Sequence, residues 1–152
     1  QPCRPMSRGQ ITLASSEPLQ PPLIDMKFLS DETDLYDVKC GIECIEALLD
    51  REELKSITVT EKSINLAKST VEEKLDDFRN RSVSIYHLCG TCRLGSDASK
   101  APVSNDFKLR ALSNLWIADA SLFPNVTSGN INAPVMMLAS KAANSICNQL
   151  SK

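Results

Sequence analysis

Residues 86–95 read Tyr-His-Leu-Cys-Gly-Thr-Cys-Arg-Leu-Gly and contain the single histidine of the chain, His87. Two further blocks follow: residues 118–121 read Ala-Asp-Ala-Ser, and residues 128–134 read Ser-Gly-Asn-Ile-Asn-Ala-Pro. Glycines, cysteines and small polar residues of this kind are typical of turns that carry functional groups. We therefore expect the chemistry of the protein in its second half, with His87 as the main acid-base candidate because imidazole titrates near neutral pH.

Composition excludes several classes of protein. The chain has 152 residues, 17 Lys and Arg against 19 Asp and Glu, and 42% hydrophobic residues. This balance of interspersed charges gives no electrostatic footprint for nucleic acid, and the apolar content is enough for a globular core. No apolar run approaches the roughly 20 residues of a membrane helix. The N-terminus lacks the features of a signal peptide, so the cytoplasm is the default expectation, and a start at Gln1 suggests a processed product or a piece of a longer protein.

The glycines and cysteines exclude two common kinds of site. The five glycines are too far apart to form a dinucleotide-binding or P-loop motif; they are Gly9, Gly41, Gly90, Gly95 and Gly129. We expect the six cysteines to be mostly reduced and buried, because a chain of this size does not need disulfides. A zinc site would have to combine Cys40 and Cys44 with two of His87, Cys89 and Cys92. We disfavour it, since Cys44 falls beside the apolar stripe of a predicted helix, and we predict no metal.

Hydrophobic periodicity predicts two extended segments and two helices in the first half. Residues 10–14 and 21–25 have the pattern of edge strands punctuated by proline. Apolar residues spaced three and four apart then predict an amphipathic helix over 31–50 and a second over 61–79. The first stripe consists of Leu35, Val38, Ile42, Ile45 and Leu49, and the second of Ile64, Ala67, Val71, Leu75 and Phe78.

A change in amino-acid composition near residue 80 predicts a boundary between two parts of the chain. Strands and a terminal helix are expected beyond it. Residues 83–87 have the branched and aromatic content of a strand, and residues 115–118 form an apolar run typical of a strand covered on both faces. A largely apolar helix follows, with Asn132 as its N-cap and Pro134 in its first turn.

The three blocks of the second half, taken together, resemble the C-terminal signature of the glucose-methanol-choline flavoprotein oxidoreductases. That signature reads approximately His-x-x-Gly-Thr-Cys-Arg-Met-Gly, then Asp-Ala-Ser-x-x-Pro, then Ser-Gly-Asn-x-Asn-Ala-Pro before a final helix. Here Leu94 replaces the methionine and keeps an apolar side chain. Residues 5–11 and 21–25 also look like the substrate domain of the family, so the resemblance covers essentially the whole chain.

The resemblance implies an α+β fold and an incomplete enzyme. Residues 1–85 would supply part of an antiparallel substrate-side sheet with its helices. Residues 86–152 would return to the FAD-binding domain and provide one strand and the terminal helix. A complete member is several times longer and begins with a glycine-rich FAD-binding portion, which would be the missing partner of this chain. We expect the isolated chain to lack FAD, because the adenosine contacts would belong to that portion.

The resemblance also implies roles for six residues. His87 would accept the hydroxyl proton of a small alcohol while hydride passes to the flavin, and Asn130 would be its partner. Asn132 and Ala133, at the start of the last helix, would contact the pyrimidine edge of the flavin, where a helix N-terminus favours negative charge. Asp119 and Ala120 would lie near the ribityl and phosphate portion, although a plain turn at the end of a strand explains them equally well.

The implied activity is that of an FAD-dependent alcohol dehydrogenase or oxidase similar to choline dehydrogenase. Choline, other alcohols and sugars remain open as substrates, since residues outside the chain would form much of the pocket. The alternative is a free-standing, non-catalytic folded module or partner subunit that lacks the nucleotide-binding half.

Overall fold

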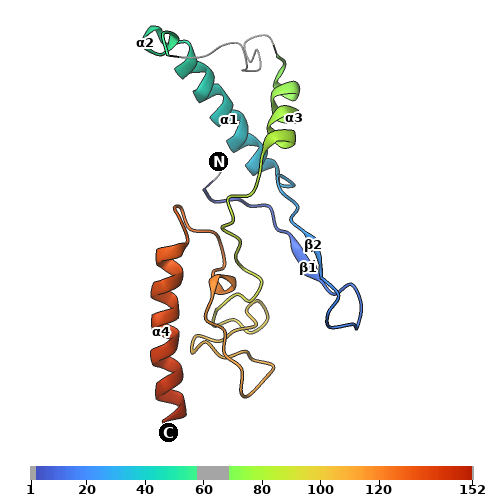
Figure 1. The fold of residues 1–152 in the computed structure, drawn as a ribbon, viewed down its shortest axis with the longest axis vertical. Coiled ribbons are helices and arrows are strands. Elements are labelled where there is room, and N and C mark those ends of the chain that lie inside the picture. Colours follow the sequence, from blue (N-terminus) through green and yellow to red (C-terminus); the bar gives the residue numbers. More distant parts are fainter. Residues whose placement is uncertain (1–2, 58–68, 152) are drawn as a thin grey trace. The chain divides into compact units, whose positions relative to one another are not determined.

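The computed structural model describes residues 3–57 and 69–151, which form two compact units (Figure 1). The first unit comprises residues 6–9 and 26–84, and the second comprises residues 3–5, 10–25 and those from 85 onward. Helices and a small antiparallel sheet give the α+β class that the sequence predicts. The assignment of residues 1–85 to a substrate domain and 86–152 to an FAD domain remains a prediction.

Helix α1, Glu32–Leu49, begins the helical part of the first unit. Its N-cap is Asp31, whose side chain accepts a hydrogen bond from the Thr33 N–H, and acidic residues in the first turn suit the positive end of the helix dipole. Val38 is buried, whereas Ile45 is 52% exposed although the predicted stripe included it. The predicted helix over 31–50 is confirmed, and a four-residue helix that was not predicted, α2 (Glu52–Lys55), follows it.

Helix α3, Val71–Arg81, packs against α1 in the first unit. It starts with a capping box, in which the Thr70 side chain accepts from the Glu73 N–H and the Glu73 carboxylate accepts from the Thr70 N–H. Leu75 is buried, and Lys74 forms an ion pair with Glu46 of α1. Residues 71–79 of the predicted helix over 61–79 are confirmed as helical, but Ser69 and Thr70 are not, because the capping box at Thr70 starts the helix at Val71. Residues 61–68 lie outside the described residues.

A buried carboxylate fastens the segment before β1 to α1. Asp34 is 1% exposed and accepts hydrogen bonds from the N–H groups of Met6 (2.7 Å) and Ser7 (2.9 Å) and from the Ser7 hydroxyl. Burial acts to raise the pKa of Asp34, but these hydrogen bonds outweigh it and leave the pKa below its ordinary value. The backbone of residues 6 and 7 is therefore held by a charged acceptor.

The second unit contains a short hairpin of β1, Gln10–Thr12, and β2, Leu23–Asp25. The strands pair antiparallel with Ile11 opposite Ile24, and all six residues are exposed. Strands were predicted over 10–14 and 21–25, so both are confirmed in a shorter form.

Two other predicted strands are wrong. Residues 83–87 form no strand, because Tyr86 has a φ of 63° and this left-handed conformation interrupts an extended path. Residues 115–118 make only an isolated bridge, between Trp116 and Lys108. Leu115 is 40% exposed, so this run is not covered on both faces.

A small apolar cluster forms the core of the second unit. It consists of Val103, Phe107, Leu122 and Ala142, with Cys92, Leu94, Leu109, Trp116, Ile117 and Leu138 packed around it. Helix α4, Asn132–Leu150, contributes Ala142 and Leu138. Near its C-terminal end, Gln149 accepts from the Trp116 indole (3.2 Å) and donates to the Asp106 carbonyl (3.1 Å).

The start of α4 differs by one residue from the prediction. Its N-cap is Ile131, with no side-chain hydrogen bond at the cap, so Asn132 is the first helical residue rather than the cap. Pro134 is nevertheless in the first turn, where its missing N–H is tolerated.

The expectation that the cysteines are buried is also wrong. Cys89 and Cys92 are half-buried, and the other four are exposed: Cys3, Cys40, Cys44 and Cys147. Among residues 3–57 and 69–151, no three histidine, cysteine or acidic side chains gather as a metal site. No helix in this part of the chain is long and apolar enough to cross a membrane.

Candidate active site

His87 and Asn130 form the centre of the candidate site. The His87 Nε2 and Asn130 Oδ1 atoms are 3.0 Å apart, within hydrogen-bonding distance, although the two residues are 43 positions apart in the sequence. His87 is half-buried and Asn130 is exposed. The predicted proximity of these two side chains is therefore confirmed, while their catalytic roles remain predictions.

This pair can accommodate more than one protonation state of the imidazole. With the amide oxygen facing the ring, Nε2–H donates and the lone pair of the neutral ring is on Nδ1. With the amide turned, its NH₂ group donates and the lone pair is on Nε2. An imidazolium can donate Nε2–H to the amide oxygen, so Asn130 is placed to stabilise His87 after it has accepted a proton.

The residue before His87 has an unfavourable backbone conformation. Tyr86 has a φ of 63° and is 86% exposed. A left-handed conformation costs a bulky residue roughly 1–2 kcal/mol, and such conformations persist mostly at functional sites. The sequence motif gave no indication of this feature.

Backbone hydrogen bonds join the first block to the second. The N–H groups of Cys92 and Leu94 donate to the carbonyls of Ser121 (3.1 Å) and Leu122 (3.0 Å). Gly90 has a φ of 93°, and a Cβ atom there would lie 3.4 Å from the Phe123 carbonyl oxygen. Glycine is favoured at this position because the left-handed conformation disfavours a side chain.

Asp119 stabilises the turn that receives these hydrogen bonds. Its Oδ1 accepts from the Ser121 N–H (2.8 Å) and the Ser121 hydroxyl (2.5 Å), at the start of the 3₁₀ helix η3, Ala120–Leu122. Ala120 is half-buried within this turn. The geometry therefore gives Asp119 a structural function, and the cofactor role of Asp119 and Ala120 remains a prediction.

The start of α4 has N–H groups that no side chain caps. Asn132 and Ala133 are exposed first-turn residues, and Ile131 has no side-chain acceptor for their N–H groups. Asn130, the partner of His87, immediately precedes this cap. The structure thus brings the imidazole–amide pair next to a helix start that is suited to an anionic oxygen.

An arginine that the sequence did not single out braces the loop after the first block. Arg110 Nε donates to the Ala101 carbonyl (3.0 Å), and its Nη2 donates to the carbonyls of Gly95 (2.7 Å) and Ser96 (3.3 Å). Three loop carbonyls are thereby satisfied by one guanidinium. An isolated arginine has no sequence signal for such a role, because its partners are backbone atoms.

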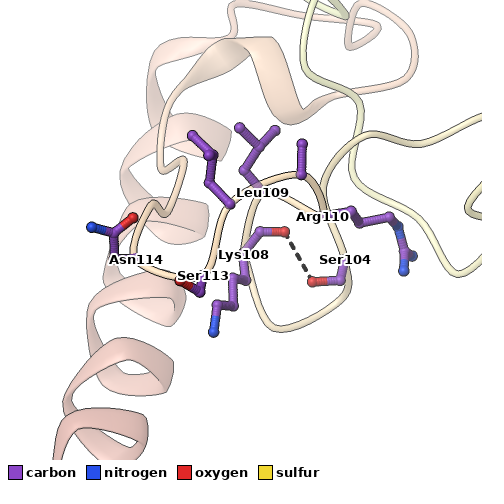
Figure 2. A pocket seen from close by; sticks show the side chains of 8 residues that line it. Ser104, Lys108, Leu109, Arg110, Ser113 and Asn114 are labelled. Atoms are coloured by element: carbon purple, nitrogen blue, oxygen red, sulfur yellow. Dashed lines mark hydrogen bonds between the residues drawn. The ribbon is translucent and has the colours of Figure 1, made fainter.

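A shallow pocket of the second unit is lined by neither His87 nor Asn130. Figure 2 shows this pocket, a shallow space of about 690 Å³ lined by Ser104 and by residues 108–114. The Ser104 hydroxyl donates to the Lys108 carbonyl (3.0 Å) at its edge. None of the six predicted site residues lines it, so we base the candidate site on the imidazole–amide pair and not on the size of the pocket.

Comparison with known families gives the decisive observation: the GMC oxidoreductase model matches residues 5–139 of this chain. The chain belongs to the GMC oxidoreductase family. The match covers the C-terminal portion of these proteins, and the chain spans about a quarter of the length of the curated relatives that it matches.

Individual GMC oxidoreductases show the same likeness. The alcohol dehydrogenase [acceptor] of Pseudomonas putida is 38% identical over 91% of this chain and 25% of its own length. The oxygen-dependent choline dehydrogenase of Cronobacter sakazakii is 33% identical over 94% of this chain and 25% of its own.

Solved structures of GMC oxidoreductases agree with the fold. Pyridoxine 4-oxidase from Mesorbium loti is 32% identical with a TM-score of 0.76, covering 93% of this chain and 28% of its own. Formate oxidase from Aspergillus oryzae is 26% identical with a TM-score of 0.84, covering 97% of this chain and 26% of its own. The recognition of a GMC oxidoreductase from the sequence blocks is confirmed.

Proposed function

We propose that this chain is the C-terminal portion of an FAD-dependent GMC oxidoreductase that oxidises a small alcohol by hydride transfer. The observation that carries the proposal is the 3.0 Å contact between His87 Nε2 and Asn130 Oδ1 beside the start of α4. The family is FAD-dependent, and the alcohol and choline dehydrogenases among its relatives support a CH–OH donor.

The described residues fit one end of the cofactor. The uncapped N–H groups of Asn132 and Ala133 suit an anionic oxygen, and a reduced flavin carries negative charge near N1 and its C2 carbonyl. When bound, FAD supplies a hydride acceptor. Asp119 and Ala120 would contribute to the ribityl side, with the Asp119 carboxylate fixing the turn rather than contacting a phosphate. The adenosine contacts would come from an N-terminal portion outside this chain.

His87 would act as the general base. It accepts the hydroxyl proton of the alcohol on its imidazole as the C–H bond is broken. The Asn130 amide then accepts the Nε2–H of the imidazolium, and it also positions the substrate oxygen. Because an amide does not compete for the proton, loss of Asn130 affects positioning more than proton transfer.

The test uses the complete flavoprotein that carries this chain, with anaerobic stopped-flow measurement of flavin reduction by a saturating alcohol. We expect His87→Ala to reduce the rate about 100-fold or more and Asn130→Ala to reduce it by a smaller factor. Flavin content should stay unchanged in both variants, because neither side chain is expected to hold the phosphates.

A matched control is Asn114→Ala, which removes an amide that lines the shallow pocket. It should leave the rate of flavin reduction unchanged. An unaltered rate in the His87→Ala variant would falsify the assignment of the base and would favour a structural role for His87. If the chain is produced in the cell as a short protein, and if it binds no flavin even together with an N-terminal partner, the non-catalytic module would be favoured.

A further inference from the structure

The exposed face of α1 carries a pair of thiols that the oxidoreductase site does not use. Cys40 and Cys44 are four residues apart on the helix and both are exposed. Residues with this spacing lie one above the other on the same helix face, with Cβ atoms about 5–6 Å apart. The backbone of α1 therefore fixes the separation of the two Cβ atoms that carry these soft ligand atoms.

This separation disfavours a disulfide and suits a bridging metal ion. A disulfide requires Cβ atoms about 3.5–4.5 Å apart, which is closer than a regular helix places residues four positions apart. Two bonds of about the zinc–thiolate length, 2.3 Å, placed in a line would separate the sulfur atoms by about 4.6 Å, which is compatible with this Cβ separation. We propose that Cys40 and Cys44 form a two-coordinate site for a thiophilic monovalent cation, Cu(I).

The number and type of ligands decide the class of ion. Zinc prefers four ligands in a tetrahedral arrangement, and no third histidine, cysteine or acidic side chain joins the pair among the described residues. Soft thiolates select Cu(I), and two of them can complete a linear coordination. On binding, each thiol loses its proton to solvent, so that one Cu(I) and two thiols give one anionic bis-thiolate complex and two protons, with no change of oxidation state.

The neighbours of the pair support a cation. The Tyr36 side chain, one turn before Cys40, shares a side-chain hydrogen bond with Cys40. Such hydrogen bonds to a ligand atom orient it and strengthen metal binding. The carboxylates of Glu43 and Asp37 also act on this part of the helix face and add negative potential.

The space beside the pair is open. Gly41 lies three residues before Cys44, and a Cβ atom there would meet no other atom within 4 Å. Residue 41 therefore contributes no side chain to the helix face beside Cys40 and Cys44.

The test is an anaerobic titration of the reduced complete flavoprotein that carries this chain with Cu(I), using bicinchoninate as the competing chromophoric ligand. We expect Cys40→Ser and Cys44→Ser each to remove one tightly bound equivalent. Tyr36→Phe should retain that equivalent with an affinity lowered about 10-fold or more, because it removes only the hydrogen bond to the ligand.

Two controls separate this site from other thiols. Cys147→Ser removes an exposed thiol on α4, and Cys89→Ser breaks the other closely spaced cysteine pair, so both should retain the equivalent assigned to Cys40 and Cys44. Far-ultraviolet circular dichroism checks that helix content is equal in all variants. An unchanged number of tight equivalents in either Cys40→Ser or Cys44→Ser would overturn the proposal.

Discussion

The two units of the molecule are stabilised in different ways. In the first, α1 and α3 pack through periodic apolar residues, and the buried Asp34 holds the backbone of Met6 and Ser7. In the second, the residues between Ile85 and α4 form isolated bridges and one 3₁₀ turn around a small core. Regular elements give the first unit its shape, whereas hydrogen bonds between loop backbones position the candidate site in the second.

The largest expected effect is on the core of the second unit. Leu122 is 1% exposed and packs with Val103, Phe107 and Ala142. Leu122→Ala should lower the free energy of unfolding of this unit by about 2–5 kcal/mol, because it leaves a cavity in a core of few residues. Hydrogen exchange, followed by mass spectrometry, should show faster exchange in α4 and in residues 90–95.

The matched control is Leu112→Ala, at a residue that is 51% exposed, and it should change little. The distinction between the two units also predicts that Leu122→Ala leaves exchange in α1 unchanged. Equal acceleration in α1 and α4 would show that the units unfold together, and the comparison would then be wrong.

The next-largest expected effect is a loss of stability when the buried carboxylate of the first unit is replaced. Asp34→Asn replaces an acceptor of three hydrogen bonds by an amide that also carries donors, so one N–H or hydroxyl loses its acceptor. We expect a loss of about 1–3 kcal/mol in the stability of the first unit. The exposed Asp37→Asn, on the same helix, is the control and should have little effect.

The pH dependence of this contribution follows from the lowered pKa of Asp34. An Asp whose folded pKa lies below its unfolded value stabilises the protein above the unfolded value, about 3.9, and this contribution is lost as the pH falls through the folded pKa. Hydrogen exchange in α1 between pH 5 and pH 3 should therefore show a steeper loss of stability in the wild type than in Asp34→Asn. If stability fell with pH in the same way in the wild type and in Asp34→Asn, the role of this carboxylate would be contradicted.

The smallest expected effect is on stability, from relief of backbone strain at one position in each unit. Lys27 in the first unit and Tyr86 in the second both have positive φ, at 45° and 63°. Glycine at either position relieves the strain, although it adds conformational entropy to the unfolded chain, so each variant should be more stable by roughly 1 kcal/mol or less. In the complete flavoprotein, Tyr86→Gly should slow flavin reduction severalfold because it loosens His87, whereas Lys27→Gly should not. Equal rates of flavin reduction in the wild type and in Tyr86→Gly would show that the strain at Tyr86 does not contribute to catalysis.

The helix over 31–50 was predicted well because its periodic apolar residues and its N-cap, Asp31, are local signals. The start of the second helix was not predicted: α3 begins at Val71 after the capping box at Thr70, inside the stretch 61–79 that the periodicity indicated as one helix. The strands over 83–87 and 115–118 failed because strand pairing depends on partners that the local sequence does not specify. Ile45 and Cys44 are exposed for a similar reason, since a stripe is buried only where another element covers it.

The site could be predicted in part. The motif blocks identified His87 and Asn130, and the structure brings them together. The contributions of Asp34, Arg110 and the Tyr86 backbone were missed, because their partners are backbone atoms or dihedral angles that leave no motif in the sequence. Asn132 was misplaced as a cap, since Ile131 takes that position without a polar side chain.

The apolar cap of α4 links ligand binding to the order of a helix. Ile131 is 8% exposed and has no side chain that can accept from the first-turn N–H groups, so the first turn gains its full complement of hydrogen bonds only from outside the helix. Any anion that supplies these acceptors binds the formed turn and not the frayed one, and it must therefore shift the local opening equilibrium toward the closed state. Amide exchange at the beginning of α4 therefore reports whether an anion is bound there. The slowing of exchange at each residue would measure how much the bound anion stabilises that part of the helix backbone.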